Sequence, residues 1–302
     1  MGRRATMNAR KRNRRLLYGS VVVAVIGLVL VFVLIYQAAT NDPYSKYIGQ
    51  PVATGVLKEV TGVSDSTLAA VGEPSGVSPP AKVTGTELTS NGLPEVLYVG
   101  AEYCPYCAIE RWSLIMALSH FGTFKGIYYM QSSSTDVNPN TPTFTFINST
   151  YTSKYIAFVP VEEYNRAKAS LTNLTTTQSN LFTQYDVCAA DSSASDGFPF
   201  VDIANTYAVN CGAQSALDIS NENWTTIASQ LNDSSSSTAQ LIDGAANTLI
   251  SAICNVDGGQ PTSVCSQSFA TVSIGGPISV SNPVQSYAVA AAPERVEPKW
   301  TA

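Results

Sequence analysis

A Cys-Pro-Tyr-Cys tetrapeptide at residues 104–107 lies where a strand pattern turns into a helix pattern. The preceding run, residues 94–100, is short, apolar and partly β-branched, which is typical of a buried strand. The following segment, residues 105–120, has proline at its first position and carries an apolar stripe. We therefore expect Cys104 to lie at the N-terminus of a helix that packs on a sheet, with its sulfur facing solvent.

This position predicts a reactive thiol at Cys104. Unpaired backbone N–H groups and the positive end of the helix dipole meet at a helix N-terminus. They favour the thiolate and can lower a cysteine pKa from about 8.5 to between about 3.5 and 7.5. Cys107, one turn later, can attack a mixed disulfide formed at Cys104. The two are the candidate catalytic residues, and Pro105 and Tyr106 are candidate substrate contacts.

Further patterns predict an α/β domain over residues 81–275. The apolar run 126–131 predicts a strand parallel to 94–100, joined to it by a right-handed crossover. Another strand begins at Phe198-Pro199, and helices are expected near residues 178–185, 222–231 and 238–254. Residues 133–185 have the composition of an insertion, residues 37–80 that of a juxtamembrane spacer, and residues 276–302 that of a loosely ordered tail.

The tetrapeptide and Pro199 resemble features of the thioredoxin superfamily. Cys-Pro-Tyr-Cys is the glutaredoxin pattern, and the order of elements, with its insertion, is similar to that of the Dsb-type exported branch. The resemblance implies a thioredoxin-like fold, in which Pro199 is cis and faces the cysteines. It also implies that the backbone of Phe198 pairs with a bound peptide or thiol.

Several stretches are similar to an uncharacterised archaeal family of membrane-anchored thioredoxin-like proteins. They are residues 100–107, 110–112, 129–134 and 141–146. One position departs from the thioredoxin pattern: Tyr98 stands where thioredoxins carry a buried acid, and neither Glu102 nor Glu110 matches that position. The direction of any redox reaction, as oxidase, isomerase or reductase, therefore stays open.

An uncharged run of 21 residues, Leu16–Tyr36, predicts a membrane-spanning helix. At about 1.5 Å per residue it would cross roughly one bilayer core. Residues 1–15 carry seven of the 17 basic residues, so the positive-inside rule places them in the cytoplasm and the main domain outside. A cleaved signal peptide ending near Gln37-Ala38-Ala39 is the alternative.

Composition narrows the classes of partner. Residues 41–302 carry 10 basic and 22 acidic residues, which argues against nucleic-acid binding. No phosphate-binding glycine motif is found, so no organic cofactor is expected. Six cysteines agree with an oxidising compartment, and four sequons permit N-glycosylation there, at Asn148, Asn173, Asn223 and Asn232.

The other cysteines are expected to form structural disulfides, Cys188 with Cys211 and Cys254 with Cys265. Because Cys188 and Cys211 flank the Pro199 strand, a second redox relay is the alternative for that pair. A C-x-x-C can also be half of a zinc site, but a second pair at matching spacing is missing, so no metal site is predicted.

These observations predict a membrane-anchored, extracytoplasmic thiol–disulfide oxidoreductase. Its expected partners are exported cysteine-containing proteins, and an oxidase would also need a reoxidising membrane partner, such as a quinone-linked one. A peptide-binding holdase with an idle C-x-x-C and a metal-delivery protein are the competing hypotheses.

Overall fold

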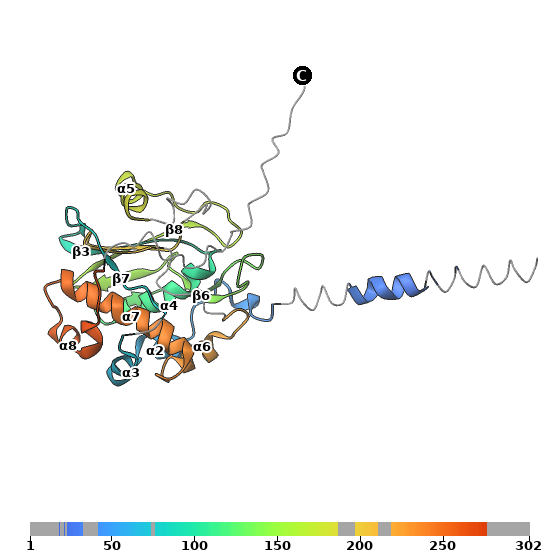
Figure 1. Ribbon diagram of the computed structural model, residues 1–302. Coiled ribbons are helices and arrows are strands. Elements are labelled where there is room, and N and C mark those ends of the chain that lie inside the picture. The colour runs from blue at the N-terminus through green and yellow to red at the C-terminus, as the bar shows by residue number, and fades with distance from the viewer. Residues whose placement is uncertain are drawn as a thin grey trace, which may run out of the picture. The chain divides into compact units, whose positions relative to one another are not determined.

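The computed structural model describes Tyr18, Val21 and residues 23–32, 42–73, 76–186, 197–210 and 219–276. The chain divides into two units, residues 1–43 and 44–302 (Figure 1). In the first unit residues 23–32 are helical and exposed. Among the described residues, no helix is both long enough and apolar enough to cross a membrane. The predicted cytoplasmic tail 1–15, much of the predicted anchor 16–36 and the tail beyond residue 276 lie outside the described residues.

A mixed six-stranded sheet forms the centre of the second unit. Its strands are β1 (Ala81–Lys82), β2 (Thr89–Ser90), β3 (Leu93–Ala101), β8 (Ala157–Tyr164), β9 (Phe200–Ile203) and β10 (Tyr207–Val209). Strand β3 pairs in parallel with β8 and antiparallel with β9, and β9 continues into a hairpin with β10. The chain is therefore a mixed α/β protein, and the strand predicted before the C-x-x-C is its central strand.

Strand β3 contributes to two hydrophobic cores because successive side chains point to opposite faces of a sheet. Val96 and Tyr98 belong to the larger core, which contains the side chains of α4 (Pro105–Ser119) and α7 (Ser237–Val256). Leu97 and Val99 belong to a smaller core with side chains of α5 (Thr176–Tyr185). Figure 1 shows α5 on one side of the sheet and α7 on the other.

Helix α4 is buried over almost its whole length, since Tyr106 and Ser119 alone of its residues are not buried. It packs against α7 and against β6 (Pro142–Thr145). The smaller helices around it are α2 (Thr54–Thr61), α3 (Asp65–Val71), α6 (Trp224–Gln230), α8 (Thr262–Cys265) and the 3₁₀ turns η1 (Ser45–Tyr47) and η2 (Ser268–Thr271).

The strand predicted at residues 126–131 forms, but not as the parallel neighbour of β3. Strand β5 (Tyr128–Gln131) instead pairs antiparallel with β6, and β4 (Gly122–Lys125) pairs antiparallel with β7 (Thr150–Ser153), in two small separate sheets. The parallel partner is β8, inside the predicted insertion 133–185. The prediction was wrong because β8 is only partly buried and carries two glutamates, so its sequence lacks the continuous apolar run of a buried parallel strand.

The predicted spacer 37–80 needs correction from Tyr44 onward. Helices α2 and α3 pack on α4 and α7, and Val56, Val60 and Leu68 are buried in the larger core. The side-chain amide of Asn247 donates to the Leu68 carbonyl at 2.9 Å. The packed unit therefore begins well before Ala81. Its start was missed because a segment rich in Pro, Gly, Ser and Thr has the composition of a linker.

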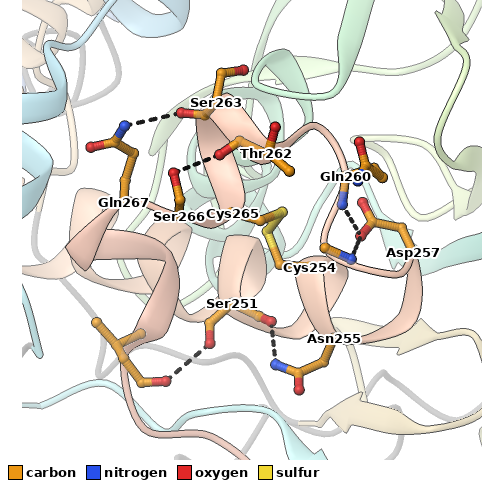
Figure 2. Close-up of a disulfide and its surroundings, with 12 residues drawn as sticks. Ser251, Cys254, Asn255, Asp257, Gln260, Thr262, Ser263, Cys265, Ser266 and Gln267 are labelled. Carbon is orange, nitrogen blue, oxygen red and sulfur yellow. Dashed lines mark hydrogen bonds between the residues drawn. A yellow bond between two sulfur atoms is a disulfide. The ribbon is translucent and has the colours of Figure 1, made fainter.

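A disulfide joins Cys254, near the end of α7, to Cys265 of α8, as predicted (Figure 2). The turn between them is held by Asp257, whose Oδ1 accepts the backbone N–H groups of Gly259 and Gln260, each at 3.0 Å. The predicted pair Cys188 and Cys211 lies outside the described residues.

Candidate active site

The two cysteines of the C-x-x-C lie at the junction of β3 and α4 as free thiols. Cys104 is the N-cap of α4, and its Sγ accepts the backbone N–H of Cys107 at 3.3 Å. Pro105 occupies the first turn, where its missing N–H leaves no bond unmade. At the N-terminus of α4, a backbone N–H group that has no acceptor within the helix is therefore donated to the sulfur of Cys104.

The cis-proline strand brings a second segment to Cys104. The peptide bond between Phe198 and Pro199 is cis, as the resemblance implied. The carbonyl oxygen of Phe198 lies 3.9 Å from the Cys104 Sγ, which can donate its thiol hydrogen to it. The contact follows from sheet register, because Phe200 of β9 pairs with Val99 near the end of β3.

Aromatic side chains gather at this end of α4. Phe198 packs against Tyr164 at 6.2 Å between ring centroids and stacks on Phe182 of α5 at 5.8 Å. Tyr164 in turn contacts Tyr103 at 6.2 Å. We call Tyr103, Tyr164, Phe182 and Phe198 the aromatic cluster. All four belong to, or pack against, the hydrophobic core that contains the two cysteines.

The expectation that the Cys104 sulfur faces solvent is therefore corrected. Cys104 is 6% exposed and Cys107 is fully buried. Tyr164, Phe182 and Phe198 are far from the C-x-x-C in sequence, so the sequence pattern around residue 104 could not reveal that Cys104 is buried among them. Tyr106, between the cysteines, is half-buried.

A buried ion pair joins α4 to β8 beneath the cysteines. The Arg111 Nε donates to Glu162 Oε1 at 2.8 Å, and its Nη2 donates to Oε2 at 2.7 Å. The Arg111 Nη2 also donates to the Ala101 carbonyl at 2.9 Å. Ala101 ends β3, so the guanidinium links the helix to the last residue of the central strand.

The environments of the two thiols shift their pKa values in opposite directions. Burial raises the pKa of Cys104, but the thiol and backbone N–H of Cys107 and the positive charge of Arg111 together bring it below its ordinary value. Burial and the neighbouring Cys104 sulfur raise the pKa of Cys107 well above its ordinary value. The site thus favours a thiolate at Cys104 and a protonated thiol at Cys107.

Tyr98 stands where the thioredoxin pattern has an acid, and it is fully buried. Its ring lies 5.8 Å from the Arg111 guanidinium carbon and 5.4 Å from the ring of Phe146. Burial raises the pKa of Tyr98 well above its ordinary value, so its hydroxyl stays protonated. Of the acids considered from the sequence, Glu102 accepts a hydrogen bond from Thr145 at 2.7 Å.

Sequence reasoning assigned no role to Arg111 or Glu162. Arg111 left one usable signal, a charge four residues after Cys107 in a largely apolar helix. Glu162 left none, because its place depends on the pairing of β8 with β3, which sets Glu162 opposite Gly100. His120, the one histidine of the chain, is the C-cap of α4 and packs against Phe269, so it lies at the opposite end of the helix from Cys104.

No group of three or more His, Cys, Asp or Glu side chains within the described ranges could hold a metal ion. Comparison with known proteins finds one family model, described as "Domain of unknown function (DUF929)", which matches residues 79–255. No curated protein matches the chain, and no solved structure does. The matched residues include the C-x-x-C, the buried ion pair and the cis-proline strand. Because they make up more than half of the 302 residues, the chain belongs to the DUF929 family.

Proposed function

We propose that this protein is a thiol–disulfide oxidoreductase in which Cys104 exchanges with substrates and Cys107 resolves the mixed disulfide. The observation that carries the proposal is the placement of the Cys104 sulfur. It lies at a helix N-terminus and 3.9 Å from the carbonyl of Phe198. A backbone carbonyl beside a thiolate is suited to align an extended peptide that carries a cysteine.

The opposite pKa shifts of the two thiols suit the two roles. In the oxidising direction a substrate thiolate attacks Cys104 Sγ of a Cys104–Cys107 disulfide, which releases Cys107 as a thiolate. Cys107 then takes up a proton, as its raised pKa favours. A second substrate thiolate attacks the substrate sulfur of the mixed disulfide and releases the Cys104 thiolate, which the site stabilises. Two electrons pass from the substrate to the cysteine pair.

The arrangement of elements supports a thioredoxin-like fold for this domain. Strand β3, helix α4 and the parallel strand β8 are followed by the antiparallel β9–β10 hairpin and the terminal helix α7. The excursion that carries β4 to β7, between α4 and β8, would be the inserted part. Residues 44–71 would form an N-terminal extension of that fold.

We further propose that residues 16–36 anchor the protein and that the domain works outside the cytoplasm on exported cysteine-containing proteins. The Cys254–Cys265 disulfide supports an oxidising compartment. Working as an oxidase, the protein would need a membrane partner, for which a quinone-linked oxidant is the proposed chemical class.

A trapping experiment tests the proposed function. In the full-length chain, Cys107→Ser leaves Cys104 without its resolving thiol, so substrates should accumulate as mixed disulfides that mass spectrometry can identify. The matched control is Cys104→Ser, which keeps the Cys107 thiol but should trap nothing. If Cys107→Ser traps no protein and Cys104 resists alkylation, the proposal fails. Full function in a Cys104→Ser/Cys107→Ser double variant would favour a peptide-binding module instead.

A further inference from the structure

The buried Arg111–Glu162 pair is costly for a purely structural contact. Both side chains are essentially inaccessible, at 0% and 1% exposure. Removing two charges from water carries a large desolvation penalty, and apolar replacements of such pairs are often neutral or stabilising. One nitrogen of Arg111, Nη1, also has no hydrogen-bond partner among the described residues. Stability alone therefore gives a poor account of this pair.

The geometry connects Arg111 to the cysteines through one residue. The backbone N–H of Ala101 donates to the Cys107 Sγ at 3.5 Å, and its carbonyl accepts from Arg111 at 2.9 Å. Cys107 and Arg111 are four residues apart on α4, so they lie on the same face of the helix. Arg111 thus lies one helical turn after Cys107, and its guanidinium is hydrogen-bonded to β3, the strand that precedes the C-x-x-C.

Two other ionisable side chains lie near the Arg111–Glu162 pair. From β3, Tyr98 presents its ring to the guanidinium. After the end of β3, Glu102 adds negative charge near Glu162. The positive charge of Arg111 favours the thiolate form of both cysteines. Glu162 holds Arg111 in place and offsets part of its field.

We propose that Arg111 is a positioning residue of the cysteine pair, whose fixed positive charge stabilises the sulfur anions formed during exchange, and that Glu162 sets the strength of this effect. The inference rests on the proposed oxidoreductase function. A charge that stabilises the thiolates stabilises the reduced form, so it makes the Cys104–Cys107 disulfide more oxidising. Arg111 and Glu162 should then act on the redox equilibrium in opposite directions.

Five variants of the full-length protein test this inference. Glu162→Gln keeps the shape of the side chain and removes its charge, Arg111→Met removes the cation, Arg111→Lys keeps it, and Arg111→Met/Glu162→Gln removes both charges. The control is Asp243→Asn, which changes another fully buried acid, on α7. The readouts are the pH dependence of thiolate ultraviolet absorbance and the equilibrium with a glutathione redox buffer.

The expected shifts have opposite signs. Glu162→Gln should lower the Cys104 pKa by about one unit and move the glutathione equilibrium about tenfold toward the reduced protein. Arg111→Met should do the reverse, Arg111→Lys should retain most of the wild-type behaviour, and the double variant should fall between the single ones. Asp243→Asn should change neither readout.

The inference is overturned if folded Glu162→Gln matches Asp243→Asn in Cys104 pKa and in glutathione equilibrium, or if folded Arg111→Met shifts them in the same direction as Glu162→Gln. If Arg111→Met fails to fold, Glu162→Gln alone still decides the question. A wild-type protein that does not exchange with glutathione at all would instead contradict the proposed function, so the two failures can be told apart.

Discussion

The carbonyl oxygen of Phe198 lies 3.9 Å from the sulfur of Cys104, although 94 residues separate them in sequence. The pairing of β9 with β3 creates this proximity, and the side chain of Phe198 belongs to the same hydrophobic core as Cys104. The site is therefore a nearly buried thiol whose neighbours are one helix N-terminus, one backbone carbonyl and a group of aromatic rings.

We expect the two cysteines to differ strongly in reactivity. The lowered pKa of Cys104 means that its thiolate persists to lower pH than that of a free cysteine, whereas the raised pKa of Cys107 keeps it protonated well above neutral pH. In the Cys107→Ser variant, alkylation of Cys104 should therefore continue at mildly acidic pH. In the Cys104→Ser variant, alkylation of Cys107 should be slow at every pH tested. Mass spectrometry across a pH series measures both rates. Equal rates in the two variants would contradict the described environments.

Removal of the Phe182 ring should expose Cys104. Phe182 is half-buried and stacks on Phe198, so Phe182→Ala should cost about 1–3 kcal/mol, less than a fully buried phenylalanine. It should also accelerate alkylation of Cys104 severalfold. Phe124→Ala is the control, because Phe124 is another partly buried, ring-packed residue on β4. An equal acceleration in both variants would show general loosening rather than removal of a cover.

Asp243 should make the protein less stable as the pH rises. Burial raises its pKa from 3.8 to about 8, and neither carboxylate oxygen has a hydrogen-bond partner among the described residues. Between pH of about 4 and 8 the folded state holds a proton that the unfolded state releases, so the free energy of unfolding falls with increasing pH. The loss is on the order of several kcal/mol over that window.

The variant Asp243→Asn should reduce this dependence, as measured by denaturant unfolding at several pH values. It should not abolish it, since burial also raises the pKa of Asp202 to about 7 and gives a slope of the same sign. A variant whose stability falls with pH as steeply as that of the wild type would contradict the burial of an unpaired Asp243.

The Cys254–Cys265 disulfide should stabilise the fold without affecting the redox chemistry. It closes a short loop of 11 residues in sequence separation, for which the loop-entropy model gives about 2–3 kcal/mol. Replacing both cysteines with serine should lower the free energy of unfolding by that amount, measured with urea. The glutathione equilibrium of Cys104 and Cys107 should stay unchanged, and a shift would mean that the second disulfide exchanges with the first.

The local part of the site could be predicted from the sequence. A β-branched run, a Cys-Pro pair and an apolar stripe define β3 and the start of α4, and the proline at 199 marks the strand that comes to face them. These features depend on short-range patterns, which is why their boundaries agree with the structure within about two residues.

The non-local part could not be predicted. The place of Glu162 depends on the parallel register between β3 and β8, and no local pattern specifies that register. Arg111 is visible as a charge in an apolar helix, but its partner and its distance from the sulfurs are set by tertiary packing. The same holds for α2 and α3, whose few apolar residues become significant only against α4 and α7.

Titration of the full-length protein with glutathione redox buffers tests whether Cys104 and Cys107 form a redox pair. Mass spectrometry of acid-quenched samples would report the state of each cysteine at every ratio of reduced to oxidised glutathione. We expect a reversible Cys104–Cys107 disulfide in the wild type and a stable glutathione adduct at Cys104 in Cys107→Ser. If both cysteines remain free thiols at every ratio, the assignment of a redox function to this pair is contradicted.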